Sequence, residues 1–240
     1  MRYQWIVLQD GSLPLRPNRR VTAVPHLCTA TLVWPADEKP SAANSVVADP
    51  SFSDSGWQTA QQRLRDLGAG EDCLGYFFET HRHYDHLLQL PVPEMRRMVD
   101  DAGTMSGRGW RPREMEDQHP LPGVAVIPCT GHAPDLRALR FDTGTGQTWV
   151  VGDAILDRDW LAAWGYYWPN GYGVEAIVQT WHSVAQILET ADVVIPGHGA
   201  PILVDAELLR VLVSGFPRAA YANQCPEVAD RLTRRLRQLE

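Results

Sequence analysis

The chain has 240 residues, 44% of them hydrophobic, which is enough for one large core, so we expect a single domain over residues 1–240. Its formal net charge of −7 argues against a surface that neutralises many phosphates, so nucleic acid is not an expected partner. No stretch approaches the roughly 20 consecutive apolar residues of a membrane-spanning helix, and the N-terminal apolar stretch is too short for a signal peptide, so we expect a cytoplasmic protein with no membrane partner.

The predicted elements of the first half are a β meander, a helix and a further strand. Stretches rich in β-branched and aromatic residues, separated by turn-forming Gly, Pro and Asn, predict strands at 3–8, 31–34 and 45–48. Apolar residues at helical spacing predict a helix over 55–67, and a buried strand follows at 73–78. A helix is expected at 93–102, followed by a polar surface loop that extends to Pro122.

The second half repeats this order of strands and then helices. Strands are predicted at 124–128, 136–141 and 147–152. Helices at 174–189 and 206–214 flank a short strand at 193–195, and an Arg-rich amphipathic helix closes the chain at 226–240. Because strands followed by helices occur twice, we expect an α/β fold in which two mixed sheets face each other with helices outside, a four-layer αββα sandwich.

The cysteine and lysine content argues against two kinds of chemistry. The four cysteines form no C-x-x-C pair, so neither a disulfide framework nor a thiolate zinc site is indicated. Lys39 is the only lysine and lies in a polar loop, which argues against Schiff-base catalysis.

A cluster of potential metal ligands follows the strand predicted at 73–78: His81, His83, Asp85 and His86. In an extended chain, residues two apart point the same way, so His81 and His83 can face one ion. As the chain turns into a helix, Asp85 and His86 can face a second ion close by. Imidazole and carboxylate are ligand types that zinc accepts, so the cluster predicts a metal site.

Three further candidate ligands each follow a predicted strand and stand beside glycine, which lets the backbone turn sharply near a crowded site. They are His132, Asp153 and His198. The remaining histidines lie outside this pattern, and no role is assigned to them: His26, His119 and His182.

The order H-x-H-x-D-H, G-H, G-D and P-G-H-G resembles the metallo-β-lactamase superfamily and its glyoxalase II-like branch. The resemblance implies two divalent cations, with zinc preferred and Mn²⁺ or Fe²⁺ as alternatives, held by two sets of ligands and one bridging carboxylate. The first set is His81, His83 and His132, the second is Asp85, His86 and His198, and the bridge is Asp153.

Asp49 resembles an early aspartate of the superfamily, which would support a metal-binding histidine from outside the site. The alternative is a turn residue before Pro50.

The activity implied by the resemblance is hydrolysis of an ester, thioester or lactone bond in a small-molecule substrate, by a hydroxide that bridges the two ions. Asp85 would orient this nucleophile or pass on its proton. Two alternatives belong to the same superfamily: a mononuclear iron persulfide dioxygenase-like oxidoreductase, and a phosphodiesterase or nuclease. A non-catalytic scaffold is a third, and the complete ligand set argues against it.

Segment 157–172, shortly after Asp153, is unusually aromatic. Its side chains could line an apolar pocket for an acyl chain or ring. They could equally form a packing plug or a subunit interface, and an interface would make the protein a homo-oligomer. The candidate substrate-binding residues are Trp160, Trp164, Tyr166, Tyr167 and Trp168. Quorum-signal lactonases place a tyrosine shortly after the bridging aspartate, where this chain has Ile155 and Leu156.

Overall fold

The first sheet contains five strands from the N-terminal half. The computed structural model describes residues 1–91, 113–115 and 121–240. Within these ranges the strand order follows the chain, with β1 to β3 antiparallel and β4 and β5 added in parallel. The strands are β1 (Tyr3–Gln9), β2 (Ala30–Pro35), β3 (Val46–Ala48), β4 (Tyr76–Phe78) and β5 (Arg113–Glu114). The predicted meander is therefore present at the start of the chain.

The second sheet also contains five strands, in the order β10-β9-β8-β7-β6. Only β8 and β9 pair in parallel, so this sheet is mixed as well. Its strands are β6 (Ala125–Pro128), β7 (Arg137–Asp142), β8 (Gln147–Gly152), β9 (Val193–Pro196) and β10 (Ile202–Leu203).

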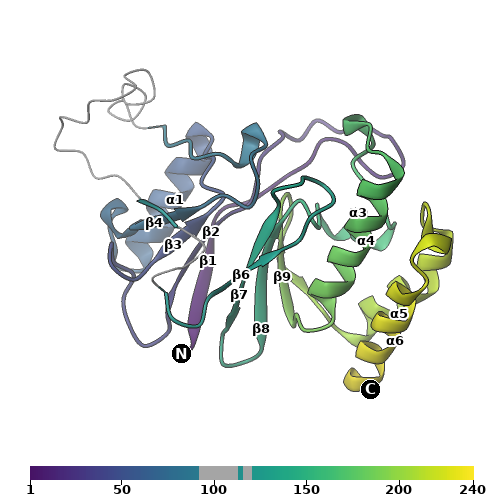
Figure 1. Ribbon diagram of the computed structural model, residues 1–240. Coiled ribbons are helices and arrows are strands. Elements are labelled where there is room, and N and C mark those ends of the chain that lie inside the picture. The colour runs from purple at the N-terminus through teal and green to yellow at the C-terminus, as the bar shows by residue number, and fades with distance from the viewer. Residues whose placement is uncertain (92–112, 116–120) are drawn as a thin grey trace.

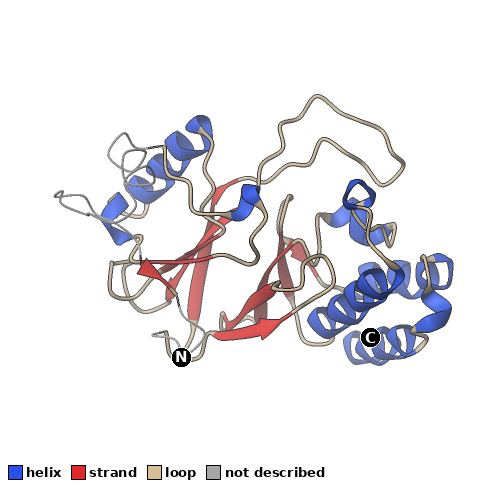
Figure 2. Ribbon diagram, turned by 45° about the horizontal axis from the view of Figure 1, so that its top comes forward, coloured by secondary structure: helices blue, strands red, loops and turns tan. Residues whose placement is uncertain are grey.

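Helices cover the outer faces of the two sheets (Figures 1 and 2). On the first sheet lies α1 (Asp54–Asp66), which begins where the Ser53 hydroxyl accepts the Gly56 N–H. On the second lie α3 (Arg158–Ala162), α4 (Val174–Leu188), α5 (Ala206–Gly215) and α6 (Glu227–Leu239). The layer order is helix, sheet, sheet, helix, which confirms the predicted αββα sandwich. None of the helices in the described ranges has the length and apolar character needed to cross a membrane.

Alternation along the strands explains why three apolar layers form. In β2, Leu32 and Trp34 pack in the cluster under α1, whereas Val33 packs between the sheets. In β8, Val150 faces the first sheet, and Trp149 packs under the helices on the other side. Both strands are buried on both faces, so the two sheets are held face to face by side chains rather than by hydrogen bonds.

Some details differ from the sequence predictions, and one prediction is not tested. The surface-loop prediction before Pro122 is wrong at residues 113–115, where β5 forms and Met115 is 1% exposed. The strand predicted at 73–78 begins only at Tyr76, because Glu71–Cys73 forms a 3-10 turn. Neither α3 nor β10 was predicted, since both are too short to produce a hydrophobic period. The helix predicted at 93–102 lies outside the described residues.

A two-point ion pair fixes the C-terminal helix α6 to the end of α4. Arg231 Nε and Nη2 donate to the two carboxylate oxygens of Glu189 at 2.8 and 2.6 Å. The side chains are only 23% and 32% exposed, and Arg231 lowers the pKa of Glu189. We therefore expect this pair to add stability.

Glu189→Gln should lower the free energy of unfolding by about 0.5–1 kcal/mol at pH 7. Because the folded-state pKa of Glu189 is lowered, the stabilisation is complete above the unfolded-state value of about 4.3 and is lost as the pH falls through the folded-state value. Urea unfolding at pH 7 and near pH 3 should show the difference from wild type shrinking in acid. Glu240→Gln is the control, because its pair with Arg210 is about half exposed. An equal loss at both pH values would contradict the assignment.

Candidate metal centre

Loops from both halves of the chain bring the seven predicted ligands together. His81 and His83 follow β4, and Asp85 and His86 lie in the 3-10 turn Tyr84–His86 directly after them. The other three follow strands of the second sheet: His132 comes after β6, Asp153 after β8 and His198 after β9. Two groups of ligand-type atoms share Asp153, one with His81, His83 and His132 and the other with His86 and His198. Asp85 lies beside the second of these groups, next to His86 and His198.

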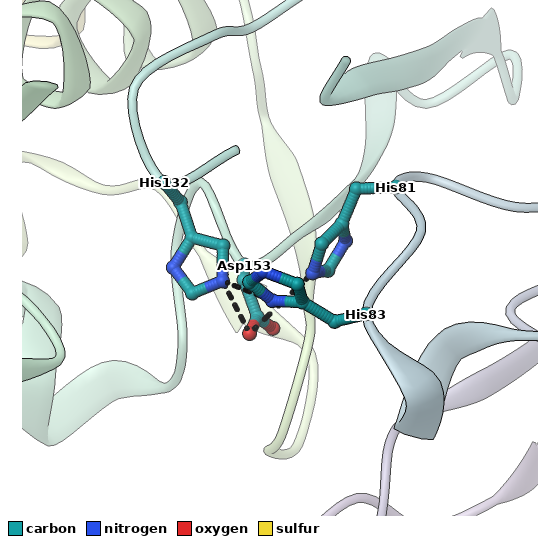
Figure 3. A group of neighbouring side chains, drawn as sticks. All are labelled: His81, His83, His132 and Asp153. Atoms are coloured by element: carbon teal, nitrogen blue, oxygen red, sulfur yellow. Dashed lines mark hydrogen bonds and ion pairs between the residues drawn. The ribbon is translucent and has the colours of Figure 1, made fainter. Parts of the chain in front are cut away.

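The first group consists of His81, His83, His132 and Asp153 (Figure 3). His132 Nε2 lies 3.0 Å from His83 Nδ1 and 3.1 Å from Asp153 Oδ2. His81 Nε2 lies 3.9 Å from the same carboxylate oxygen. Two ligands of a tetrahedral zinc ion, each about 2.0–2.1 Å from it, are about 3.3 Å apart, so these spacings suit a zinc-sized cation.

The second group forms on the other side of the same carboxylate. His86 Nε2 and His198 Nε2 each lie 3.2 Å from Asp153 Oδ1. Asp85 Oδ2 lies 3.7 Å from His86 Nε2 and 3.5 Å from His198 Nε2. Oδ2 of Asp153 faces the first group and Oδ1 faces the second. The carboxylate therefore lies between two clusters of candidate ligand atoms with similar spacings.

Four buried polar atoms of these groups have no hydrogen-bond partner: His81 Nε2, His86 Nε2, His198 Nε2 and Asp153 Oδ1. An unsatisfied buried polar atom costs roughly 1–3 kcal/mol, so four in one place require a reason. Cations between these atoms would satisfy all of them, and the donor set of imidazole and carboxylate is one that zinc and related divalent metals bind. The residues present therefore fit a metal centre.

Asp49 orients one histidine in each group. It is 1% exposed, and its Oδ2 accepts a hydrogen bond from His86 Nδ1 at 2.9 Å. The same oxygen accepts the Thr80 hydroxyl at 2.9 Å, so that hydroxyl is left to accept His81 Nδ1–H at 3.1 Å. Because both Nδ1 atoms carry their protons, both Nε2 atoms present lone pairs to the centre.

The other two imidazoles that present Nε2 are also held from outside. His198 Nδ1–H donates to the Leu27 carbonyl at 2.9 Å. His132 Nδ1 is hydrogen-bonded to the hydroxyl of Tyr172 at 3.1 Å, and Asn170 donates to that same hydroxyl. The orientation of each ring is therefore fixed by the protein before any cation binds.

Glycine is required at two positions next to ligands. Gly152 has φ +49°, in the left-handed region, and a Cβ there would collide with Thr80 Oγ1. A Cβ on Gly197 would collide with Asp153 Oδ1 itself. These glycines let the backbone approach close enough to place Asp153 and His198.

The buried histidines of the two groups differ in the direction in which their pKa values are shifted. Burial lowers the pKa of both His81 and His132 to about 3, so neither carries a proton to be displaced at neutral pH. Burial also opposes protonation of His86, but the Asp153 and Asp49 carboxylates outweigh it and raise its pKa. The pKa of Asp153 is held well below its usual value, despite burial, by the surrounding histidines. The centre is built around a permanent negative charge.

An open pocket of about 560 Å³ lies over the centre. Asp85 is the acidic ligand more open to it, with a side chain 29% exposed against 6% for Asp153. Apolar and aromatic groups line the rest, among them Leu13, Leu156, Tyr84, Tyr167 and Tyr172. The pocket therefore places an apolar wall beside the candidate ligands.

The aromatic segment 157–172 divides between the core and this pocket. Trp160 and Trp164 are 1% and 4% exposed, packed against Leu13 and against Trp181 respectively. Tyr166 packs against the core under the helices, and Trp168 packs beside Leu13 with the Arg19 guanidinium 5.3 Å from its ring centre. Tyr167 lines the open pocket.

His26 received no role from the sequence, and Tyr172 was considered only as one of the aromatic residues that could line a pocket. Tyr172, in the aromatic segment, contacts His132. His26 lies with Nε2 3.0 Å from Asp85 Oδ2, and nothing around it in the sequence marks it as a candidate. Of the other unassigned histidines, His182 lies 3.6 Å from Glu227 away from the centre, and His119 lies outside the described residues.

Both the sequence and the structure are similar to those of known proteins. No protein-family profile matches the chain. Metallo-beta-lactamase domain-containing protein 1 from Homo sapiens is 27% identical over 236 residues, which cover 93% of this chain and 84% of that protein. A metallo-β-lactamase structure from Thermotoga maritima has 20% identity and a TM-score of 0.53, covering 85% of this chain and 100% of that one. An N-acyl homoserine lactone hydrolase with product bound at its catalytic metal centre has 13% identity and a TM-score of 0.50, covering 82% and 93%. The two structures share the fold of this chain.

Asp49→Asn should weaken metal binding about 10- to 100-fold, because an amide cannot accept all the hydrogen bonds that the carboxylate receives. Competition with a chromophoric chelator measures the change. Asp142→Asn is the control, since Asp142 accepts a backbone N–H in an exposed turn. Unchanged affinity in Asp49→Asn would show that the orientation of His81 and His86 does not depend on this carboxylate.

Proposed function

We propose that this chain, a member of the metallo-β-lactamase superfamily, is a metal-dependent hydrolase that cleaves an ester, thioester or lactone bond of a small molecule. The observation that carries the proposal is the pair of ligand groups sharing the carboxylate of Asp153. Ligand-type atoms 3.0 to 3.9 Å apart, four of them buried without partners, suit two divalent cations rather than a hydrogen-bonded core. Zinc is our first choice of metal.

The proposed roles follow the two groups. His81, His83 and His132 would hold one cation, Asp85, His86 and His198 the other, and Asp153 both. Bound divalent cations supply Lewis acidity and lower the pKa of water enough to make hydroxide available near neutral pH.

The chain's own side chains supply orientation and charge. Asp153 places fixed negative charge at the centre of the site, and Asp49 and Thr80 keep His86 and His81 in the tautomers that present Nε2. Asp85 is the more exposed of the two carboxylate ligands that line the pocket, so we assign it to orient the attacking water and to accept its proton. Burial would raise the pKa of Asp85, but the hydrogen bond from His26 and the nearby histidines outweigh it and lower the pKa. The Asp85 carboxylate therefore stays ionised.

The walls of the pocket support a small substrate with an apolar part. A volume of about 560 Å³ accommodates a metabolite-sized molecule. Leu13, Leu156 and Tyr167 form an apolar side of the pocket, while the ligand groups form its floor. We propose that an acyl chain or ring lies against these residues while the scissile carbonyl faces the centre.

Metal analysis combined with a substrate panel tests the proposal. We expect about two zinc or manganese ions per chain, and turnover of p-nitrophenyl esters, lactones or acyl-thioesters that stops when a chelator removes the metal. One iron per chain with oxidation of a persulfide would contradict hydrolysis and support the oxidoreductase. Turnover confined to phosphodiesters would support the nuclease alternative.

His83→Ala and Asp85→Ala should each lower kcat/KM at least about 100-fold, because each removes a group from a cation position. Both side chains border the open pocket, so the far-UV circular dichroism should stay that of the wild type. His182→Ala, at a histidine paired with Glu227 away from the centre, is the control and should retain activity. Activity retained in either of the first two variants would reject the assigned roles.

A further inference from the structure

A long segment between β1 and β2 reaches from the first sheet to the second half of the chain. Residues 10–29 form a hairpin with bridges between Ser12 and Leu27 and between Leu15 and Val21. In Figure 1 this hairpin is the purple loop that arches above the sheets toward the helices of the second half. Loops of this length without regular structure are uncommon unless they have a function.

The hairpin 10–29 is fixed to the second half by several contacts. Trp160 Nε1 donates to the Leu15 carbonyl at 3.2 Å, and Arg16 Nη1 lies 3.2 Å from Asp157 Oδ2. At its end, the Thr29 N–H donates to the Gly197 carbonyl at 2.7 Å. The position of the hairpin relative to the metal centre is therefore defined by the fold.

Two consecutive residues of the hairpin contact the second ligand group. The Leu27 carbonyl accepts His198 Nδ1–H at 2.9 Å, and His26 Nε2 lies 3.0 Å from Asp85 Oδ2. The ring centres of His26 and His198 are 4.8 Å apart. The ligand-type atoms of His26, Asp85 and His198 all lie within 4.8 Å of one another, which is the same closeness found within the other two groups.

The distance between His26 and Asp85 is similar to the distances among the proposed ligands. Asp85 Oδ2 lies 3.5 and 3.7 Å from the Nε2 atoms of His198 and His86, and His26 Nε2 is nearer than either. His198 Nε2 is fully buried and has no hydrogen-bond partner. A cation between His198, Asp85 and His26 would satisfy this atom. Imidazole is a common protein ligand for divalent metals.

Building on the proposed function, we propose that His26 is an additional ligand of the second cation position, supplied by the hairpin 10–29. The second position then has five protein groups, Asp85, His86, His198, Asp153 and His26, whereas the first has four. The hairpin thereby connects the binding of the second cation to a segment outside the motifs that resemble the superfamily.

Metal titration of three variants tests this assignment. Metal-free wild type, His26→Ala, His26→Gln and the control His182→Ala are titrated with Zn²⁺ by calorimetry and with Co²⁺ by visible absorption, which reports coordination number. We expect His26→Ala to bind the second equivalent at least about tenfold more weakly, with a changed Co²⁺ spectrum and an unchanged first equivalent. His26→Gln should be equally weak, because an amide can still donate to Asp85 but is a poor zinc ligand. His182→Ala should match wild type.

Three outcomes would overturn the assignment. His26→Ala could bind both equivalents as wild type does, His26→Gln could restore wild-type binding, or wild type could bind fewer than two cations. The second result would make His26 a hydrogen-bonding support for Asp85. Thermal unfolding of the metal-free variants shows whether each still folds. Wild type that binds two cations but hydrolyses nothing in the panel would reject the proposed function alone, whereas an active wild type with unaffected His26 variants would reject this inference alone.

Discussion

The buried carboxylate of Asp153 is the interaction on which the rest of the centre depends. Its oxygens lie 3.1 to 3.2 Å from imidazole nitrogens of His132, His86 and His198, which come from three separate loops. A carboxylate that is only 6% exposed is costly unless positive charge faces it. The fold therefore brings imidazoles, which can pair with this carboxylate or hold a cation beside it, to this point from both halves of the chain. The apolar layer between the sheets, which includes Phe78, Val150 and Ile195, sets the distance at which those loops meet.

Much of this architecture can be read from the sequence because strong local patterns produce it. Strands such as β2 and β8 consist mostly of apolar residues and are buried on both faces, and α4 and α5 carry clear apolar periods. Short elements cannot be found this way: β10 has two residues and α3 has five, so their existence depends on contacts with distant parts of the chain. Met115 was missed for the same reason, as a single apolar residue in a polar stretch.

The residues of the candidate site also differ in whether a local pattern in the sequence reveals them. Residues grouped in the motif at 81–86, or standing beside glycine after a strand, can be identified because the spacing itself suggests the chemistry. The structure brings all of them to one place. His26 and Tyr172 carry no such spacing, and their positions come from a hairpin and an aromatic segment that fold over the centre. The aromatic segment also shows why composition alone is insufficient: Trp160 serves the core and Tyr167 the pocket, although they are only seven positions apart.

The position of Asp49 limits how such a centre can diverge. One carboxylate reaches His86 directly and His81 through Thr80, so both groups of candidate ligands share a single support. A substitution there would alter both halves together. Substitutions that change the metal preference of one group and preserve the other therefore have to lie at residues that contact only one group. Tyr172, which contacts His132, and the hairpin 10–29, which contacts Asp85, are such residues.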